Sequence, residues 1–305
     1  MVSIFRFLLF LFISSLNAQK IPIIIDADTA NEVDDLFAIS GALSEPTFNI
    51  IGITASQFNT SPLASLQSAS ESKKINDEIL ELAKMSSIPS LLGSNQPITS
   101  ISNIKNSQAS TFILKNARQY SKHNPLHIVI LGSCTNIATA IINAPDILDK
   151  IKVYYLGFWH DQITNSYNKN EFNSRNDPLA MNFLLDSPNL DLSVMTATTS
   201  QHLVFERKEL DVFLSKNSPL GLYLKNRWDS YQRWFTDEDK EKNKWIMWDI
   251  AIIEAIANDK YSEFSYFETP PVNVNRKIKI FTKINVLEMK KSYWEKIQIF
   301  NIKNE

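Results

Sequence analysis

The stretch IIIDADTANEVDDLF, residues 23–37, joins an apolar run to a cluster of four aspartates, Asp26, Asp28, Asp34 and Asp35. The apolar residues over 21–25 predict a buried strand, and the periodicity over 33–43 predicts a helix. The first two aspartates follow the strand, and the last two begin the helix. A strand followed directly by a helix is the opening unit of an α/β sheet.

Short apolar runs continue along the chain and alternate with segments of helical periodicity. The strand-like runs are NIIGITA (49–55), LHIVILG (126–132), IKVYYLG (151–157) and LDLSVMT (190–196). Helix-like segments between them include 107–121 and 178–186. Nearly continuous apolar strands are typical of a parallel sheet covered on both faces. The sequence therefore predicts an open, mostly parallel, Rossmann-like α/β fold with helices on both faces.

The C-terminal third is expected to be largely helical over 210–257, with a charged break between two helices at WDSYQRWFTDEDKEKNKW (228–245), and to end in an appended hairpin from Pro270 on. No internal repeat, low-complexity tract or long linker interrupts 19–305, which predicts a single domain over those residues. The chain has no GxGxxG and no GxxxxGK[ST] motif, so we expect neither a dinucleotide site nor a P-loop.

Residues 1–18 have the layout of a secretory signal peptide: one arginine, an apolar stretch over 7–13, then small and polar residues ending at Ala18. The apolar stretch is much shorter than the roughly 20 residues that span a bilayer. We therefore expect cleavage after Ala18, a periplasmic or secreted protein, and no membrane attachment afterwards. The one cysteine, Cys134, cannot form an internal disulfide.

Charge gives no reason to expect a nucleic-acid partner. The chain has 31 basic and 33 acidic residues and a net charge of -2, and the two signs are interspersed. Sequence-independent binding to nucleic acid or anionic lipid depends on an excess of basic residues. We expect a small-molecule ligand instead.

The aspartate cluster predicts a metal site. Ligands of an open α/β sheet bind beyond the carboxyl ends of its strands, where these four side chains lie. Four carboxylates in one crevice repel unless some are protonated or a cation lies among them. The candidate ligands are oxygens, and the four histidines lack zinc spacing, so the ion is Ca²⁺ or Mg²⁺, with Ca²⁺ favoured if backbone carbonyls complete the shell. Alternatively, Asp34 and Asp35 are ordinary first-turn acids that complement the helix dipole.

Two other carboxylate motifs fit less well. The hhhDxDxT pattern of dehalogenase-type phosphatases would make Asp26 the nucleophile and Asp28 the acid, but Thr29 falls one position early. An EF-hand loop starting at Asp26 would have Asn31 in place of the turn glycine and Phe37 in place of the bidentate glutamate.

The segment DADTANEVDD, 26–35, resembles the signature of the inosine-uridine-preferring nucleoside hydrolases, in a longer form with five residues between DxD and DD. The likeness continues, in the family's order, through LGSCTNIATA (131–140), NEFNSRNDPLA (170–180) and WDIAIIEA (248–255). The resemblance implies the nucleoside hydrolase fold over 19–305. It also implies an N-glycosidase that releases nucleobase and ribose from a ribonucleoside, and a homodimer or homotetramer.

The resemblance also implies a metal shell. Ca²⁺ would be held by the side chains of Asp28, Asp35 and Asp249, by the backbone carbonyl of Thr135 and by a bound water. Asp28 would have a second role as the base that takes a proton from the attacking water. Asp26 would support the loop from behind.

The ribose ligands are implied in the same way. The side chains expected to bind the sugar hydroxyls are those of Asp34, Asn59, Asn165, Glu171 and Asn173. Cleavage passes through an oxocarbenium-like sugar, which carboxylates and oriented hydroxyl contacts stabilise. The aspartate cluster and these residues would therefore serve both the water and the sugar.

The chain departs from the family where the leaving base is protonated. Trp248 stands in place of a histidine, and an indole can stack on a base but cannot act as an acid near neutral pH. His160 is a candidate substitute acid. An exported nucleoside- or ribose-binding protein that has lost catalysis is therefore the alternative. The aromatic residues that either form core or line the base pocket are Trp228, Tyr231, Trp234 and Phe235.

Overall fold

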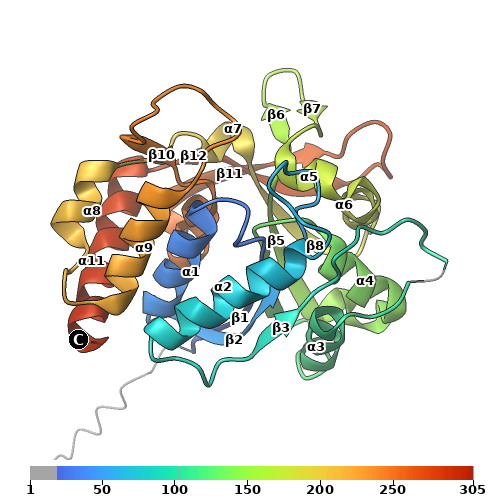
Figure 1. Ribbon diagram of the computed structural model, residues 1–305. Helices are drawn as coiled ribbons and strands as arrows, with labels where there is room; N and C mark the ends of the chain where they lie inside the picture. The colour runs from blue at the N-terminus through green and yellow to red at the C-terminus, as the bar shows by residue number, and fades with distance from the viewer. Residues whose placement is uncertain (1–18, 103, 305) are drawn as a thin grey trace, which may run out of the picture.

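Parallel strands form the centre of this computed structural model, which describes residues 19–102 and 104–304. Within that part of the chain, eight strands form one sheet in the order β11-β12-β8-β5-β4-β1-β2-β3 (Figure 1). Their bounds are β1 (Ile21–Ala27), β2 (Phe48–Ala55), β3 (Ser90–Leu92), β4 (Leu126–Ile130), β5 (Ile151–Gly157), β8 (Asp191–Thr196), β11 (Ser262–Glu268) and β12 (Lys277–Ile284). Neighbours pair in parallel, apart from the antiparallel pair β11–β12.

Successive residues of a strand enter opposite cores. Ile23 and Ile25 of β1 belong to one core and Ile24 to the other, because side chains alternate across a sheet. The helices that pack into the first core are α1 (Asp34–Ser44), α2 (Ser68–Leu82), α10 (Trp248–Ala257) and α11 (Val286–Asn304). Those that pack into the second are α3 (Gln108–Ala117), α4 (Thr135–Asn143) and α6 (Pro178–Leu185). The predicted open α/β fold with two covered faces is confirmed.

Shorter elements lie around this sheet. The remaining helices are η1 (Pro145–Lys150), α5 (Phe172–Asn176), α7 (Ala197–Ser200), α8 (Arg207–Phe213), α9 (Pro219–Ser230) and η2 (Asp259–Tyr261), of which α9 also packs into the first core. Two small antiparallel pairs consist of β6 (Trp159–Asp161) with β7 (Ser166–Asn168), and β9 (Val204–Glu206) with β10 (Lys244–Ile246). The segment 231–243 between α9 and β10 has no regular structure.

The C-terminal part differs from the sequence-based expectation. The appended hairpin expected from Pro270 on is instead the pair β11–β12, and β12 joins the main sheet beside β8. Ile278 and Ile280 of β12 are buried in one core and Phe281 in the other, which explains why the strand is central rather than appended. The chain then continues into α11.

The strand order places a crevice beside β1. From β1 the chain adds β2 and β3 on one side and β4, β5 and β8 on the other, so connections diverge between β1 and β4. Such a switch point leaves a crevice at the carboxyl ends of the strands. Asp26 lies at that end of β1, and Thr135 begins the helix after β4. The ends of β1 and β4, which carry the aspartate-rich stretch and Thr135, therefore meet at this crevice.

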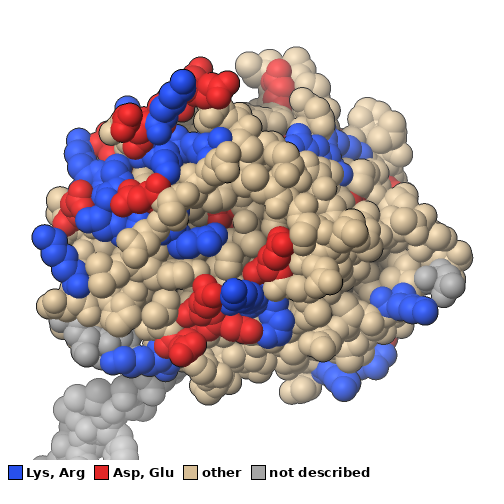
Figure 2. All heavy atoms as spheres, viewed as in Figure 1, with Lys and Arg blue, Asp and Glu red and all other residues tan. Residues whose placement is uncertain are grey.

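The outer surface is mixed in charge. Figure 2 shows Lys and Arg interspersed with Asp and Glu on the face in view. Among the described residues, no helix combines the length and the apolar character needed to cross a membrane. The predicted signal peptide, 1–18, lies outside the described residues.

Candidate active site

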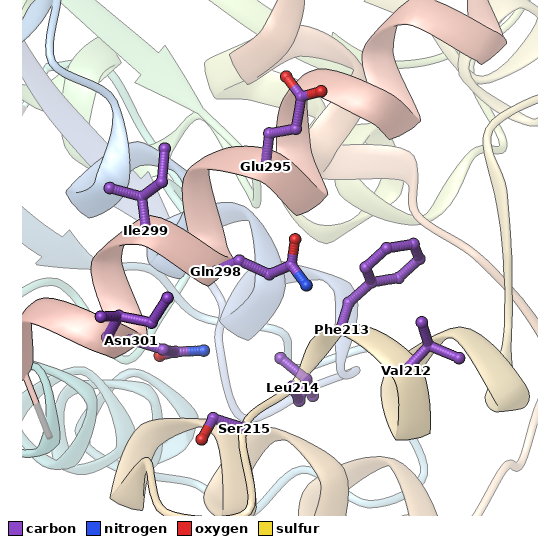
Figure 3. A pocket seen from close by; sticks show the side chains of 9 residues that line it. Val212, Phe213, Leu214, Ser215, Glu295, Gln298, Ile299 and Asn301 are labelled. Atoms are coloured by element: carbon purple, nitrogen blue, oxygen red, sulfur yellow. The ribbon is translucent and has the colours of Figure 1, made fainter.

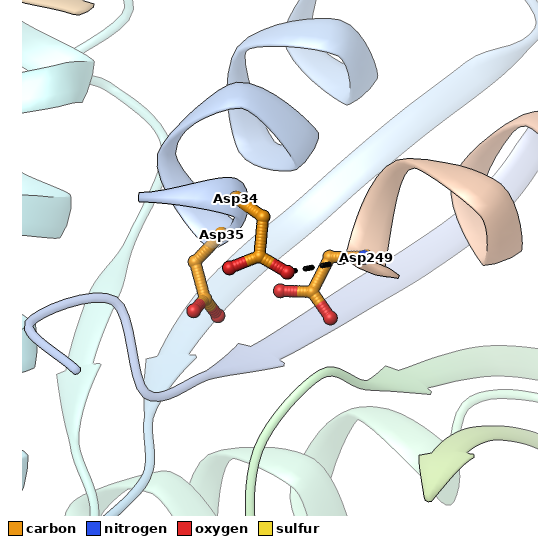
Figure 4. A group of neighbouring side chains, drawn as sticks. All are labelled: Asp34, Asp35 and Asp249. Carbon is orange, nitrogen blue, oxygen red and sulfur yellow. Dashed lines mark hydrogen bonds between the residues drawn. The ribbon is translucent and has the colours of Figure 1, made fainter. Parts of the chain in front are cut away.

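Three aspartates converge where two helices begin. Oxygens of Asp34, Asp35 and Asp249 all lie within 4.8 Å of one another (Figure 4). Asp34 and Asp35 open α1, and Asp249 lies in the first turn of α10. Helix N-termini favour negative charge, so both helix dipoles partly offset the repulsion among the carboxylates. The helix-start interpretation and the metal interpretation of Asp34 and Asp35 are thus compatible.

Asp28 lies beside this group, and its environment leaves a ligand atom free. Asp28 is 1% exposed, and its Oδ2 has no hydrogen-bond partner among the described residues. The same holds for Oδ1 of Asp35. Buried polar atoms are nearly always paired, so two unpaired carboxylate oxygens beside further carboxylates fit a bound cation. An all-oxygen donor set suits a hard divalent ion.

Burial and mutual repulsion disfavour the charged form of the whole group. Burial raises the pKa of Asp34 to about 7. Burial and the charge of Asp34 raise the pKa of Asp28 and of Asp249 well above the usual range, and burial and the charge of Asp28 do the same for Asp35. These carboxyl groups therefore hold their protons more tightly than ordinary aspartates do, and a bound divalent cation would compete with those protons.

Asp26 lies behind the cluster and connects three elements. Its Oδ1 accepts from Thr54 Oγ1 at 2.5 Å and from Asn136 Nδ2 at 2.9 Å. Asn136 Nδ2 also donates to the carbonyl of Ala55 at 3.0 Å. Burial raises the pKa of Asp26 to about 7. The side chain thereby links β1, β2 and α4, and it is not part of the cavity wall that includes Asp28.

Gly132 allows the turn after β4 to approach Asp28 closely. A Cβ at this position would lie 2.3 Å from Ser56 Oγ and 2.8 Å from Asp28 Oδ1. Both distances are shorter than van der Waals contact, so any side chain here would displace Asp28. The first glycine of LGSCTNIATA therefore has a steric role in the site.

Thr135 is the first residue of α4, and its side chain forms a hydrogen bond with Asp177. Its Oγ1 donates to Asp177 Oδ2 at 2.7 Å. Asp177 in turn caps α6, since its Oδ1 accepts from the backbone N–H of Ala180 at 2.9 Å. Cys134, just before Thr135, is buried. The predicted role of the Thr135 carbonyl in metal binding stays a prediction.

The carboxylates open into a cavity of about 940 Å³. Such a volume falls within the usual range for small-molecule sites. Its polar and charged lining includes Asp28, Asn31, Glu32, Asp34, Asp35, Asn170, Glu171, Asn173, Arg175, Arg233, Glu238, Asp239, Lys244 and Asp249. Its aromatic lining is Trp159, Phe172, Trp234, Phe235, Trp245 and Trp248.

Glu171 and Asn173 lie in the cavity wall and are held by several hydrogen bonds. Glu171 caps α5, accepting from the backbone N–H groups of Asn173 at 2.9 Å and Ser174 at 3.0 Å. Asn173 Nδ2 donates to the carbonyls of Leu131 at 2.6 Å and Leu156 at 3.1 Å, which ties the ends of β4 and β5 together. Burial raises the pKa of Glu171. Both residues share the cavity with the aspartates.

Asn59 and Asn165 lie outside the residues that line the cavity. Asn59 accepts from Ser68 Oγ at 2.7 Å and donates to the carbonyl of Asn95 at 2.8 Å. Asn165 has a φ of 50° in the β6–β7 turn. The structure does not bring these two side chains to the aspartates, and their roles as ribose ligands stay predictions.

His160, the candidate substitute acid, is also absent from the cavity lining. Its Nε2 lies 2.9 Å from Asn165 Oδ1. Its ring packs against those of Tyr167 and Phe267, with centroids 4.6 Å away in each case. These contacts indicate a structural role in anchoring the β6–β7 hairpin.

The aromatic residues divide between core and cavity. Trp228 is fully buried in the core, and Tyr231 is 8% exposed there. Trp234 and Phe235, beyond the end of α9, line the cavity. Trp248 also lines it and meets Trp159 edge to face, with centroids 5.9 Å apart at 90°.

Several residues of the cavity wall are not predicted from the sequence, among them Asn31, Glu32, Arg233 and Trp245. Asn31 and Glu32 belong to the five residues between DxD and DD, so the extra length of that stretch was the available signal. Arg233 and Trp245 belong to the stretch 228–245, for which the sequence predicts a charged break between two helices and no role in the site.

A second groove has different chemistry. It encloses about 560 Å³ between α8 and α11 and is lined mainly by apolar and amide side chains, including Val212, Phe213, Gln298 and Ile299 (Figure 3). Glu295 is its one titratable lining residue within the described part of the chain. It lacks the convergent charged groups of the larger cavity.

Comparisons with known proteins agree with this geometry. The family model described as inosine-uridine preferring nucleoside hydrolase matches residues 23–290, most of the chain. A search of curated proteins found no match. A purine-preferring ribonucleoside hydrolase from Gardnerella vaginalis has a similar structure, with 20% identity, 92% of this chain and 99% of that chain covered, and a TM-score of 0.73.

Two further solved structures share the fold. A plant nucleoside hydrolase has 17% identity, covers 91% of this chain and 98% of its own, and gives a TM-score of 0.69. An inosine-uridine preferring nucleoside hydrolase from Bacillus anthracis has 12% identity, coverage of 92% and 99%, and a TM-score of 0.64. The match of the family model over most of the sequence decides the assignment, and the chain belongs to the inosine-uridine preferring nucleoside hydrolase family.

Proposed function

We propose that this protein is a Ca²⁺-dependent hydrolase that cleaves the N-glycosidic bond of a ribonucleoside and releases nucleobase and ribose. The observation that carries the proposal is the group of Asp34, Asp35 and Asp249, whose oxygens lie within 4.8 Å of one another in the wall of a 940 Å³ cavity. Membership of the nucleoside hydrolase family supports the same reaction class.

Asp28 is the proposed base. It lines the cavity beside the other aspartates, and its Oδ2 has no partner among the described residues, so this oxygen is free to take a proton from an attacking water. Bound Ca²⁺ would lower the pKa of that water and offset the charge of the carboxylates. Asp28, Asp35, Asp249 and the Thr135 carbonyl are the proposed metal ligands.

The sugar is proposed to bind between the aspartates and α5. Asp34, Glu171 and Asn173 line the same cavity and supply oxygen and amide groups for ribose hydroxyls. The hydrogen bonds that fix Glu171 and Asn173 keep them in place before substrate arrives, which is how such contacts favour a transition state. The carboxylates of Asp34 and Glu171 also stabilise positive charge that develops on the sugar ring.

Trp248 is proposed to stack on the nucleobase. Its ring lines the cavity and is supported edge-on by Trp159. An aromatic face favours a cationic, protonated base over a neutral one. The leaving group would therefore gain its proton from solvent, with the indole stabilising the product of that protonation.

The test is a panel of ribonucleosides incubated with purified protein, with reducing sugar measured. We expect hydrolysis of at least one nucleoside, loss of activity in chelator, recovery with Ca²⁺, and a fall in kcat of at least about 10³-fold in Asp28→Asn, as for loss of an essential base. Activity indifferent to both chelator and Asp28→Asn would exclude the mechanism.

A second candidate is an exported nucleoside- or ribose-binding protein without catalysis. Within the described residues no histidine lines the cavity, and this observation favours it. Tight nucleoside binding with no turnover across the panel would decide for this alternative. Export itself is proposed from residues 1–18, and N-terminal sequencing of protein from the natural cell is expected to begin at Gln19.

A further inference from the structure

The stretch between the two aspartate pairs forms a fixed part of the cavity wall. The backbone N–H of Asn31 donates to the carbonyl of Asp28 at 2.7 Å, and the carbonyl of Asn31 accepts from the hydroxyl of Tyr231. These bonds hold the turn from both sides. Asn31 and Glu32 therefore present their side chains to the cavity from a rigid backbone.

Trp245 joins this turn to a distant segment. Its Nε1 donates to Glu32 Oε1 at 2.5 Å. The guanidinium of Arg233 lies over its ring, 4.0 Å from the centroid. Arg233 is held in turn by Asp239 Oδ2 at 3.3 Å and by the carbonyl of Lys244. An acceptor and a cation thus flank one indole, and both line the cavity.

Two polar atoms in this part of the cavity wall have no hydrogen-bond partner among the described residues. Oδ1 of Asn31 and Nε of Arg233 have no partner among the described residues, although Asn31 is only 6% exposed and the Arg233 side chain 9%. Buried polar groups without partners are uncommon, and in a cavity wall they indicate where a ligand completes the pairing. The unused acceptor is Oδ1 of Asn31 and the unused donor is Nε of Arg233, and the Glu32 side chain lines the wall beside them with its Oε1 bonded to Trp245.

Resting on the proposed function, we propose that Asn31, Glu32 and Arg233 select the nucleobase, and that the base they select is a 6-oxopurine with a 2-amino group, which is guanine. The N1–H and 2-amino group of guanine lie side by side and suit the acceptor oxygens of the Glu32 side chain, which lines the wall. Its O6 accepts from a guanidinium, the same pairing by which Arg recognises guanine in nucleic acids.

Adenine would meet this wall with the wrong groups. Its N1 is an acceptor and would face the Glu32 carboxylate, while its 6-amino donor would face the Arg233 guanidinium. A buried site strongly discriminates against a ligand that leaves its polar groups unpaired or opposed. It discriminates only weakly against a ligand that merely lacks a methylene group. Inosine, which keeps N1–H and O6 but lacks the 2-amino group, is expected to fall between guanosine and adenosine.

The kinetic test uses purified full-length protein with Ca²⁺ and four substrates: guanosine, inosine, adenosine and 1-methylguanosine. We expect kcat/KM to decrease from guanosine through inosine to adenosine, with 1-methylguanosine disfavoured because it lacks N1–H. Glu32→Gln keeps the size of the side chain and replaces one acceptor oxygen by a donor. It should lower the guanosine-to-adenosine ratio of kcat/KM by roughly 10-fold, the upper range for loss of one hydrogen bond.

The matched control is Glu263→Gln, which alters an exposed glutamate of β11 paired only with Lys283. Its ratio should equal that of the unaltered protein. A Glu32→Gln variant that slows every nucleoside equally would show a structural role for Glu32 and overturn the inference. Equal kcat/KM for guanosine and adenosine in the unaltered protein would overturn it as well.

A binding measurement separates this inference from the proposed hydrolysis. 9-Deazaguanosine and 9-deazaadenosine carry the base on a carbon–carbon bond that the enzyme cannot hydrolyse, so calorimetry reports recognition alone. We expect 9-deazaguanosine to bind at least about 10-fold more tightly, with the difference lost in Glu32→Gln. If no nucleoside is hydrolysed but this preference holds, the proposed function fails and the base selection stands. Equal binding of the two analogues overturns the base selection whether or not hydrolysis occurs.

Discussion

The backbone N–H of Asp249 donates to Oδ2 of Asp34 at 3.4 Å, although the two residues are 215 positions apart (Figure 4). Asp34 opens α1 and Asp249 lies in the first turn of α10, so this contact joins two helix N-termini at the carboxyl end of β1. The contact explains how negative side chains can be gathered here, because each helix supplies backbone donors and a favourable dipole. The cluster is thus built by helix packing as much as by the aspartate-rich stretch itself.

Calcium is expected to stabilise the folded protein through this cluster. At 100 times its dissociation constant, a ligand that binds only the native state adds about 2.7 kcal/mol. Thermal unfolding should therefore show a higher Tm with Ca²⁺ than with chelator, and Asp249→Asn should lose most of the increase. The control is Asp146→Asn, an exposed residue paired with Arg118, which should keep the full response. A Tm that does not respond to Ca²⁺ would contradict a metal at this site.

The metal-free protein should lose stability as pH rises from about 4 to about 7. Asp26 and Asp34 have a pKa of about 7 in the folded protein against 3.8 for an ordinary aspartate, so the folded state binds their protons more tightly. The stability that these protons contribute is fully present below the ordinary pKa of 3.8. It decreases between that pH and the folded pKa of about 7, by up to about 1.4 kcal/mol per pH unit for each group.

Urea denaturation in chelator at pH 5, 6, 7 and 8 measures this dependence. Ca²⁺ should flatten the decrease, because the ion replaces the protons of the cluster. Asp26→Asn should remove part of the slope while keeping acceptance from Thr54 and Asn136, since an amide oxygen can replace Oδ1. A free energy of unfolding that increases between pH 5 and pH 8 in chelator would contradict this prediction.

Gly132→Ala should damage the site with little effect on the rest of the fold. The new Cβ would lie 2.8 Å from Asp28 Oδ1 and 2.3 Å from Ser56 Oγ, and Asp28 must move to relieve the clash. A displacement of about 1 Å at a reacting group costs on the order of 10²-fold in rate, so kcat should fall by about that factor. The comparison is Gly221→Ala in α9, where the nearest atom is 3.0 Å from the new Cβ. Unchanged kcat in Gly132→Ala would contradict the role of Asp28.

Trp248 should contribute mainly to binding of the base. Stacking of a base on an aromatic side chain is worth about 1–3 kcal/mol, so Trp248→Ala should lower kcat/KM by roughly 5- to 100-fold. Trp248→Phe keeps an aromatic face and should retain most of the activity. Steady-state kinetics on the best nucleoside of the panel distinguish the two variants. Equal losses in both would indicate that the indole acts through its N–H or its support of Trp159 rather than through stacking.

The sheet could be predicted because each of its central strands is recognisable from its own apolar sequence. The runs 126–132 and 151–157 are nearly continuously apolar, as is typical of buried parallel strands, and both form central strands, β4 and β5. The place of β12 could not be predicted in this way, because periodicity shows that a strand exists without showing its partner. Ile278 and Ile280 identify the pairing only once the cores are known.

The site was partly predictable for a related reason. Asp28, Asp34 and Asp35 are close in sequence, so the local pattern placed them together, and the resemblance to a family added Asp249. The contact of Trp245 with Glu32 spans 213 positions and rests on tertiary packing alone. No local pattern predicts such a pair, so the sequence could not predict that Glu32 and Trp245 lie together in the cavity wall.

The most direct test of the central claim is to follow one nucleoside through the reaction in water enriched in ¹⁸O. Protein stripped of metal by chelator is compared with the same protein after Ca²⁺ is restored, and base and ribose are measured by mass spectrometry. We expect equal amounts of base and ribose with one ¹⁸O on the sugar, only in the Ca²⁺-restored sample. Nucleoside that binds but remains intact with Ca²⁺, or cleavage that proceeds equally in chelator, would contradict it.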